Sequence, residues 1–158
     1  MTKIKNSFNP VIYFCVCLLT MILFDLIITD NIINNIFLTT ESKFIDIVYV
    51  QNTGAAFSSF QHLTIFLVVL SILAVLFILW ELFKDKYKYS LTLYFFSAML
   101  CSGIICNTYE RISFGYVRDF INLKFVEFPV FNISDVLINV AVLAIMILVI
   151  TKKYKRNV

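Results

Sequence analysis

The sequence predicts an all-α membrane protein in which four transmembrane helices carry a small amount of β structure outside the membrane. Hydrophobic residues make up 61% of the 158 residues, whereas they make up roughly 45–50% of a soluble domain. Charged residues make up only 15%, and the mean hydropathy is +0.91. Four apolar runs are long enough to cross a bilayer as helices. We therefore expect residues 1–158 to form a single integral membrane domain.

The apolar runs predict spans at residues 11–29, 63–83, 91–109 and 133–150. Lys3 and Lys5 precede the first run, as basic residues precede the apolar part of a cleaved signal peptide. The run is long for a signal peptide, however, and no A-x-A cleavage site follows it. We therefore expect the first run to remain as an uncleaved transmembrane helix.

Two longer polar segments separate these spans, and each contains a stretch typical of a β-strand. Residues 44–50, FIDIVYV, are rich in β-branched and aromatic side chains. Residues 51–54, QNTG, follow with a composition typical of a turn. Residues 116–126 alternate loosely between apolar and polar side chains. These stretches predict two strands on the side of the membrane that the loops share.

Basic residues gather on one side of the predicted membrane. With four spans, this side holds nine of the thirteen lysines and arginines, namely Lys3, Lys5, Lys84, Lys86, Lys88, Lys152, Lys153, Lys155 and Arg156. Cytoplasmic segments carry such an excess of positive charge. We therefore expect both termini to lie in the cytoplasm.

A second group of polar residues falls on the opposite, extracytoplasmic side: Asp25, Asp46, Asn52, Glu110, Arg111, Asp119 and Asp135. A charged side chain at the bilayer centre costs roughly 2.5–3.5 kcal/mol on insertion scales, so ionisable residues within membrane segments usually serve a function. The placement of all these residues on one side predicts a functional site at the outer membrane–water interface.

The third and fourth spans each carry a polar stripe at this outer end. The members are separated by three, four or one positions and therefore share a helix face: Gly103, Asn107, Glu110 and Arg111 on the third span, and Asn132, Asp135 and Asn139 on the fourth. Glycine on such a face lets another backbone or a ligand approach closely. The stripes predict a polar face at the outer end of each of these two helices.

Several chemistries are disfavoured by the residues present. The single histidine, His62, is not part of an H-E-x-x-H zinc motif, and no serine lies in a G-x-S-x-G segment. Four cysteines lie within apolar runs and match no zinc spacing, so we interpret them as small hydrophobic residues: Cys15, Cys17, Cys101 and Cys106. Without a long basic run interleaved with aromatic residues, nucleic-acid binding is not expected.

Two aspartates, Asp119 and Asp135, remain as candidates for acid–base chemistry. Two neighbouring carboxyl groups that share one proton have separated pKa values, so that one acts as a base and the other as an acid. Asp135 could instead be a first-turn acid favoured by the helix dipole, and Asp119 could form a solvated surface pair with Arg118. Other roles also remain open for four further polar residues. Arg111 could bind lipid phosphate, and Asn107 and Asn139 could form interhelical hydrogen bonds. Asp25 could cap a neighbouring segment.

Three segments resemble the lipoprotein signal peptidase family, also called signal peptidase II. Residues 52–57, NTGAAF, resemble the pattern N-x-G-A-A-[FW]. Residues 115–120, GYVRDF, resemble G-x-V-x-D-F, and residues 131–135, FNISD, resemble F-N-x-A-D. The segments occur in the same order as in that family and on a four-span plan of the same size.

The resemblance implies an aspartic endopeptidase with Asp119 and Asp135 as its catalytic dyad. The family's supporting polar positions correspond here to Asp25, Asn52, Gly54, Asn107, Arg111 and Asn132. No metal or other cofactor is implied. The family's outer loops form a small extracytoplasmic β-cradle, which agrees with the strands expected at 44–50 and 116–126.

The implied reaction takes place in the bacterial inner, or cytoplasmic, membrane. The substrates would be prolipoproteins whose signal-peptide helix and diacylglyceryl-cysteine enter from the lipid, and cleavage would occur just before that cysteine at the extracytoplasmic face. Membrane lipid is the other expected partner, and we expect a monomer.

Departures from the family pattern leave alternatives open. The third-span segment G-G-A-x-G-N-x-x-D-R reads SGIICNTYER here, so Ser102 and Cys106 replace glycines and Glu110 replaces aspartate. Thr29 stands where lysine is usual, and Ser134 replaces alanine. The chain could therefore be a catalytically inactive family member. A non-enzymatic carrier or lipid-binding protein is the other alternative, although the inner halves of the spans carry almost no ionisable residues for a transport path.

Overall fold

The computed structural model describes residues 9–35, 42–54, 64–84 and 88–155. In these ranges four helices are long and apolar enough to cross a membrane: α1 (Pro10–Asn34), α2 (Thr64–Lys84), α3 (Leu91–Phe114) and α4 (Ile133–Ile150). Two strands, β1 (Ile45–Asn52) and β2 (Val117–Leu123), form an antiparallel sheet. The predicted fold class, four apolar helices with a small β structure, is confirmed.

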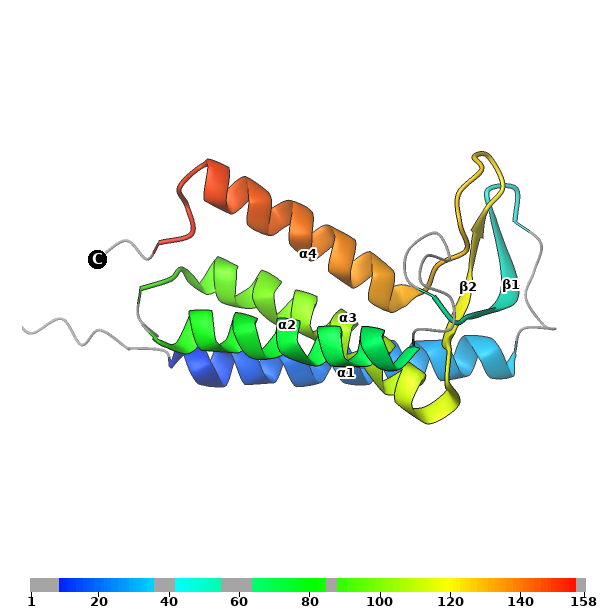
Figure 1. Ribbon diagram of the computed structural model, residues 1–158. Helices are drawn as coiled ribbons and strands as arrows, with labels where there is room; N and C mark the ends of the chain where they lie inside the picture. The colour runs from blue at the N-terminus through cyan, green and yellow to red at the C-terminus, as the bar shows by residue number, and fades with distance from the viewer. Residues whose placement is uncertain (1–8, 36–41, 55–63, 85–87, 156–158) are drawn as a thin grey trace, which may run out of the picture.

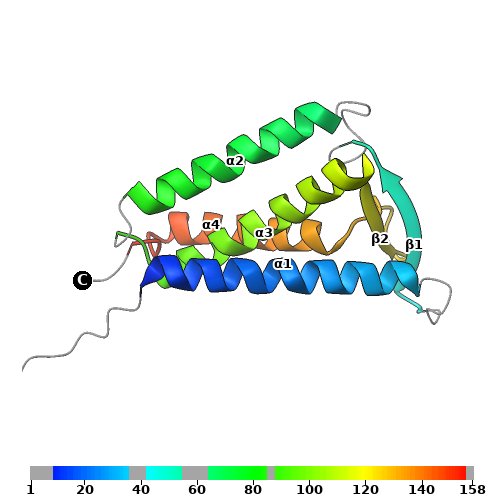
Figure 2. The same ribbon diagram turned by 90° about the horizontal axis from the view of Figure 1, so that it is seen from below.

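Helix α3 is the centre of the bundle, and the sheet lies across one end of it (Figure 1). About 56% of the membrane-crossing window of α3 is buried, compared with 11–17% in the other helices. The sheet is beside the C-terminal ends of α1 and α3 and the N-terminal ends of α2 and α4, whereas the C-terminus of the chain lies at the opposite end (Figures 1 and 2). The sheet therefore marks one end of the bundle, where two helices end and the other two begin.

Local sequence signals fix where the helices begin. The Asn9 side chain accepts a hydrogen bond from the Val11 N–H, and Pro10 occupies the first helical position, where its missing N–H is not needed. Ser90 caps α3 by accepting from the Leu93 N–H at 3.2 Å. Gly115 ends α3 in the left-handed conformation, with φ of +83°, which glycine adopts without strain.

Two helices extend further than the apolar runs suggest. Helix α1 continues to Asn34 rather than ending at 29, and α3 continues to Phe114 rather than ending at 109. Hydropathy marks where lipid contact ends, but a helix satisfies its own backbone hydrogen bonds and can continue beyond the lipid. The additional helical turns hold polar residues at the sheet end of the bundle, including Asp30 of α1 and Glu110 of α3.

The opposite end of the bundle is held by aromatic packing. Tyr94 is fully buried, stacks on Phe83 with ring centroids 6.1 Å apart, and donates a hydrogen bond to the Leu82 carbonyl at 3.1 Å. The Phe14 ring of α1 packs edge-on against Phe83 at 5.4 Å. The Ser90 N–H also donates to the Tyr154 carbonyl at 2.8 Å. This end is closed by a core, whereas the polar residues gather at the other end.

The sheet connects to the start of α4. Strand β1 pairs with β2 in a register that joins Val50 to Asp119, with an irregularity between Ile47 and Val50. The Phe120 and Ile121 N–H groups donate to the Phe131 carbonyl at 3.1 and 2.8 Å, and the Phe131 N–H donates to Ile121. Phe131 immediately precedes the N-cap of α4, so the backbone holds β2 beside the beginning of that helix.

Candidate active site

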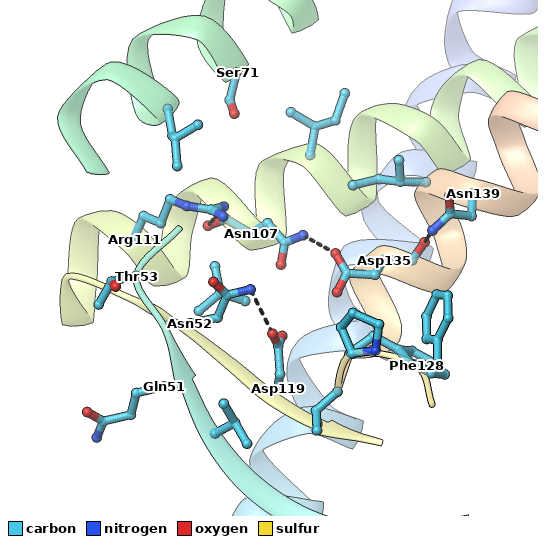
Figure 3. A pocket seen from close by; sticks show the side chains of 18 residues that line it. Gln51, Asn52, Thr53, Ser71, Asn107, Arg111, Asp119, Phe128, Asp135 and Asn139 are labelled. Carbon is cyan, nitrogen blue, oxygen red and sulfur yellow. Dashed lines mark hydrogen bonds between the residues drawn. The ribbon is translucent and has the colours of Figure 1, made fainter. Parts of the chain in front are cut away.

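A cavity of about 530 Å³ lies where the sheet meets α2, α3 and α4. Asp119 and Asp135 both line it, from β2 and α4 respectively (Figure 3). The other polar side chains on its wall belong to the sheet and the surrounding helices: Gln51, Asn52, Thr53, Ser71, Asn107, Arg111 and Asn139. Two carboxyl groups from different elements, a strand and a helix, therefore share one cavity at the sheet end of the bundle.

Asp119 is held by β1 and is 1% exposed. The Asn52 amide donates to Asp119 Oδ2 at 2.9 Å, and Asn52 is itself fixed because its Oδ1 accepts from the Gly54 N–H at 3.0 Å. No described residue donates a hydrogen bond to Asp119 Oδ1, although this atom is buried. The pKa of Asp119 is raised to about 7: burial is the largest cause, the Asn52 amide opposes the rise by donating a hydrogen bond, and the neighbouring Asp135 carboxylate adds to it.

Asp135 belongs to the first turn of α4 and forms a capping box with Asn132. Its backbone N–H donates to Asn132 Oδ1 at 2.9 Å, and the Asn132 N–H donates back to Asp135 Oδ2 at 3.2 Å. The first-turn interpretation of Asp135 is therefore correct as a description of the helix. It does not exclude a second role, because the Asp135 side chain also lines the cavity (Figure 3).

Two asparagines connect α3 to the capping box. Asn107 Nδ2 donates to Asp135 Oδ1 at 2.9 Å, and Asn132 Nδ2 donates to Asn107 Oδ1 at 3.0 Å. Together with the two capping bonds, whose donors are backbone N–H groups, these contacts link Asn107, Asn132 and Asp135 in a closed ring of hydrogen bonds. Each amide therefore uses both its donor and its acceptor side, and Asp135 accepts an N–H on each oxygen.

Arg111 connects α3 to the turn after β1. Its Nη2 donates to the Gly54 carbonyl at 2.8 Å and its Nη1 to the Asn107 carbonyl at 3.2 Å. The side chain lies on the cavity wall (Figure 3), where two of its nitrogens are used by backbone carbonyls. Gly54 thus supplies an acceptor for Arg111 and a donor for Asn52.

Asp25 lies outside the cavity wall, buried between α1 and α4 at 3% exposure. It accepts hydrogen bonds from the hydroxyl of Thr29 at 3.1 Å and from that of Ser134. Because Ser134 directly precedes Asp135, Asp25 can affect the dyad through the position of α4. The departures at 29 and 134 supply both of its hydroxyl partners.

Arg118 does not pair with Asp119. Neighbouring residues in a strand point to opposite faces, so Asp119 faces the cavity while Arg118 faces Glu110 of α3, with an N–O distance of 2.6 Å. The solvated Arg118–Asp119 pair is therefore wrong. Asn139 likewise donates to the Asp135 carbonyl of its own helix, at 2.8 Å, rather than to another helix.

The described residues contain no group of three or more histidine, cysteine or acidic side chains arranged to hold a metal ion. The arrangement instead offers one buried carboxyl group on Asp119, one half-buried carboxyl group on Asp135, amide donors and one arginine around a single space. Sequence reasoning did not identify Ser71 or the 128–131 segment as parts of the wall. Residues 55–57 of the N-x-G-A-A-[FW] segment, and His62, lie outside the described residues.

The chain resembles known membrane peptidases along most of its length. A model of the family described as "Signal peptidase (SPase) II" matches residues 17–151. A lipoprotein signal peptidase of Lactobacillus johnsonii is 32% identical over 157 residues, covering 95% of this chain and 96% of the relative. One from Streptococcus thermophilus is 38% identical over 107 residues, covering 68% and 69% of the two chains.

A solved structure described as a bacterial membrane enzyme, obtained by the in meso method at 2.3 Å resolution, shares the fold with a TM-score of 0.77 and 22% identity. The alignment covers 92% of this chain and 93% of that structure. Together, the four-helix fold, the paired carboxyl groups and the matches over most of the sequence place the chain in one family. It belongs to the lipoprotein signal peptidase, or signal peptidase II, family.

Proposed function

We propose that the protein cleaves the signal peptide from lipid-modified prolipoproteins, just before the diacylglyceryl-cysteine, with Asp119 and Asp135 as its catalytic dyad. The observation that carries this proposal is the placement of both carboxyl groups on the wall of one cavity at the sheet end of the bundle. The cysteines lie in α1 and α3 and do not line the cavity, and among the lining residues only the two carboxyl groups can act as general bases.

The two carboxyl groups differ in a way that suggests their roles. Asp135 accepts N–H donors on both oxygens, and such donors favour the ionised form over the protonated one. Asp119 accepts only one such bond from the described residues, and burial raises its pKa to about 7. We therefore assign the shared proton to Asp119 and the negative charge to Asp135, while the dyad titrates as a coupled pair.

The reaction then needs one water between the two acids. Asp135 accepts a proton from this water as the water oxygen bonds to the scissile carbonyl carbon. Asp119 first donates a hydrogen bond to the carbonyl oxygen, which becomes negatively charged, and then transfers its proton to the cysteine nitrogen as the C–N bond breaks. The products are the carboxyl terminus of the signal peptide and the free amino group of the lipid-modified cysteine. Return of the proton from Asp135 to Asp119 completes the cycle.

The supporting residues hold this geometry. Asn52 orients Asp119, the ring of Asn107 and Asn132 orients Asp135, and Arg111 joins the two halves of the site through Gly54. Because Asp119 acts in its protonated form, the rate is expected to fall as the pH rises above about 7, where Asp119 loses its proton. This alkaline limb of the pH–rate profile reports the state of Asp119.

The proposal places the site at the extracytoplasmic face of the bacterial cytoplasmic membrane, with both termini inside. Its support is the excess of basic residues on one side of the predicted spans, of which the described Lys84, Lys88, Lys152, Lys153 and Lys155 lie at the end of the bundle opposite the sheet. The signal-peptide helix and its acyl chains would enter from the lipid between α2 and α4, which both contribute residues to the cavity wall. No second copy of the chain is needed to complete the cavity.

The test is cleavage of a diacylglyceryl-modified prolipoprotein peptide by purified protein in detergent. Asp119→Asn and Asp135→Asn should each lower the rate by about 100- to 10,000-fold, because each removes one proton-transfer group. Asp46→Asn is the matched control, since Asp46 is an acid of the same sheet that does not line the cavity. It should leave the rate unchanged.

The same assay separates the alternatives. If the wild-type protein binds the peptide but forms no product between about pH 5 and 8, it is an inactive family member that acts as a binder. Full activity of either Asp119→Asn or Asp135→Asn would refute the dyad while leaving a peptidase activity to be explained. Thermal unfolding of each variant in the same detergent checks that it is folded.

A further inference from the structure

Glu110 and Arg118 form an ion pair that is shielded from solvent and directly adjoins Asp119. Glu110, near the end of α3, has a side chain 6% exposed, and the Arg118 side chain on β2 is 11% exposed. Arg118 Nε and Nη2 both donate to Glu110 Oε1, at 2.8 and 2.6 Å. The face of the Phe114 ring covers the guanidinium, whose carbon is 4.7 Å from the ring centroid.

The same carboxylate also holds the backbone of the strand. Glu110 Oε2 accepts a hydrogen bond from the backbone N–H of Arg118 at 2.7 Å. On the other side of Asp119, the Phe120 N–H donates to the Phe131 carbonyl at 3.1 Å. Asp119 therefore lies between two fixed points, one on α3 and one at the entrance to α4, which carries Asp135.

This arrangement differs from an ordinary surface ion pair. Exposed pairs contribute little because water screens them and both side chains lose freedom. Here three charge-assisted hydrogen bonds converge on one buried carboxylate, and the planar guanidinium is held in a fixed orientation. Asp30 of α1 adds a more exposed contact to Arg118 at 3.3 Å, so three elements meet at this arginine.

We propose that the Glu110–Arg118 pair is the positioning device for Asp119: it fixes β2 against the outer end of α3 and keeps the region behind the catalytic carboxyl electrically balanced. The proposal rests on the catalytic role given to Asp119 above. Neither Glu110 nor Arg118 lines the cavity, so both act through the strand and through charge rather than by touching substrate.

The groups that shift the pKa of Asp119 come from three elements besides its own strand, and the charged ones among them from two, α3 and α4. Asp135 of α4 and Glu110 of α3 raise its pKa, Arg111 of α3 lowers it, and the uncharged Asn52 of β1 also lowers it by donating a hydrogen bond. Replacing Glu110 by glutamine removes one anion and leaves Arg118 with only its more exposed contact to Asp30. Both changes favour ionised Asp119, so the alkaline limb of the pH–rate profile should move to lower pH.

The experiment compares pH–rate profiles for the lipidated peptide between about pH 5 and 9. In Glu110→Gln we expect kcat to fall about 10- to 100-fold, because a misplacement near 1 Å can have that effect. We expect KM to change by less than about twofold, since the cavity wall is intact. The alkaline limb should move to lower pH, which loosening of the fold alone would not cause.

Two further variants make the test specific. The double variant Glu110→Gln with Arg118→Gln removes both charges, so its alkaline limb should return towards the wild-type position while kcat stays low. Glu81→Gln is the control, because Glu81 forms a half-exposed ion pair with Lys84 on α2, away from the sheet. It should match the wild type in rate and profile.

The outcomes distinguish this proposal from the proposed function. A wild-type protein that cleaves the peptide, together with a Glu110→Gln variant of wild-type kcat and profile, would overturn the positioning role alone. A Glu110→Gln variant whose activity falls only in proportion to its folded fraction, with an unmoved limb, would also overturn it. A wild-type protein without any cleavage would remove the proposed function first, and the positioning role with it.

Discussion

At the residue scale, the site contains two aspartates, Asp119 and Asp135, whose side chains receive different numbers of hydrogen bonds. Asp135 is surrounded by donors from Asn107 and Asn132, whereas a buried oxygen of Asp119 receives no hydrogen bond from the described residues. A buried polar atom without a partner is costly and is characteristic of functional sites. Asp119 Oδ1 is therefore the atom that we expect to meet the substrate carbonyl or the attacking water.

The raised pKa of Asp119 has a consequence for stability. A carboxyl group whose pKa is higher in the folded protein binds its proton more tightly there than in the unfolded chain. Between its ordinary pKa of 3.8 and about 7, folding is therefore favoured by low pH, and this contribution declines as the pH rises. The side chain introduced by Asp119→Asn cannot ionise, so the stability of this variant should decline less steeply as the pH rises.

The measurement is the thermal unfolding midpoint in detergent at several pH values from 5 to 8, compared between the wild type and Asp119→Asn. As the pH rises, the unfolding midpoint of Asp119→Asn should increase relative to that of the wild type. Asp46→Asn should keep the pH dependence of the wild type. A difference that is constant across this range would contradict the pKa assigned to Asp119.

At the element scale, the important contact is the close crossing of α3 and α4. Gly103 lies on the side of α3 that faces the first turns of α4. A Cβ atom added at Gly103 would lie 2.5 Å from the Ser134 carbonyl oxygen and 2.8 Å from Ile138 Cγ1. This crossing brings Asn107, one turn further along α3, within hydrogen-bonding distance of Asp135. A glycine at this position is thus required by the position of the dyad.

Gly103→Ala should move α4 away from α3. Small-to-large changes in packed regions cost about 1–3 kcal/mol, so a lower unfolding midpoint is expected. Activity should fall more than the folded fraction, because the Asn107–Asp135 hydrogen bond lengthens. Ile112→Ala, on the exposed face of the same helix, is the control. Wild-type stability and rate in Gly103→Ala would show that the crossing tolerates an additional methyl group.

The same scale explains what could be predicted from the sequence. Helical spacing predicted that Asn107 lies on a polar face of α3 and that Asn132 and Asp135 share a face at the start of α4, because the helical period is regular; that these two faces meet was not predicted. The Glu110–Arg118 pair was missed, although residues 116–126 were interpreted as a strand. In a strand, neighbouring side chains point to opposite faces, so Arg118 and Asp119 cannot pair with each other. We considered that pair because the two residues are adjacent in the sequence, whereas the strand period would have excluded it. The partner of Arg118 itself depends on how β2 packs on α3, which no local pattern specifies.

At the scale of the whole molecule, the bundle has two unlike ends. One end is closed by packed aromatic rings around Tyr94, and the other carries the sheet, the cavity and the buried polar residues. The described basic residues Lys84, Lys88, Lys152, Lys153 and Lys155 lie at the aromatic end, and this charge pattern supports the orientation proposed above.

This orientation can be measured by cysteine labelling in intact cells. Glu127→Cys, in the exposed loop after β2, should react with a membrane-impermeant maleimide added outside. Lys153→Cys, in the exposed segment after α4, should react only after the membrane is permeabilised. The unmodified protein gives the background from its own cysteines, which lie within α1 and α3. The reverse pattern would place the cavity in the cytoplasm and remove the proposed access of prolipoproteins to it.

The length of α4 links the chemistry to the lipids around it. Its 18 residues extend about 27 Å, at about 1.5 Å per residue, which is slightly less than the roughly 30 Å hydrocarbon thickness of a typical bilayer. A short helix is accommodated by local thinning of the bilayer, at a cost that grows with the mismatch. Because Asp135 is the third residue of this helix, longer acyl chains would draw its carboxylate into the hydrocarbon and disfavour the anion. Acyl-chain length therefore becomes a variable of catalysis, and turnover should be greatest in membranes thin enough to leave the first turn of α4 among the headgroups.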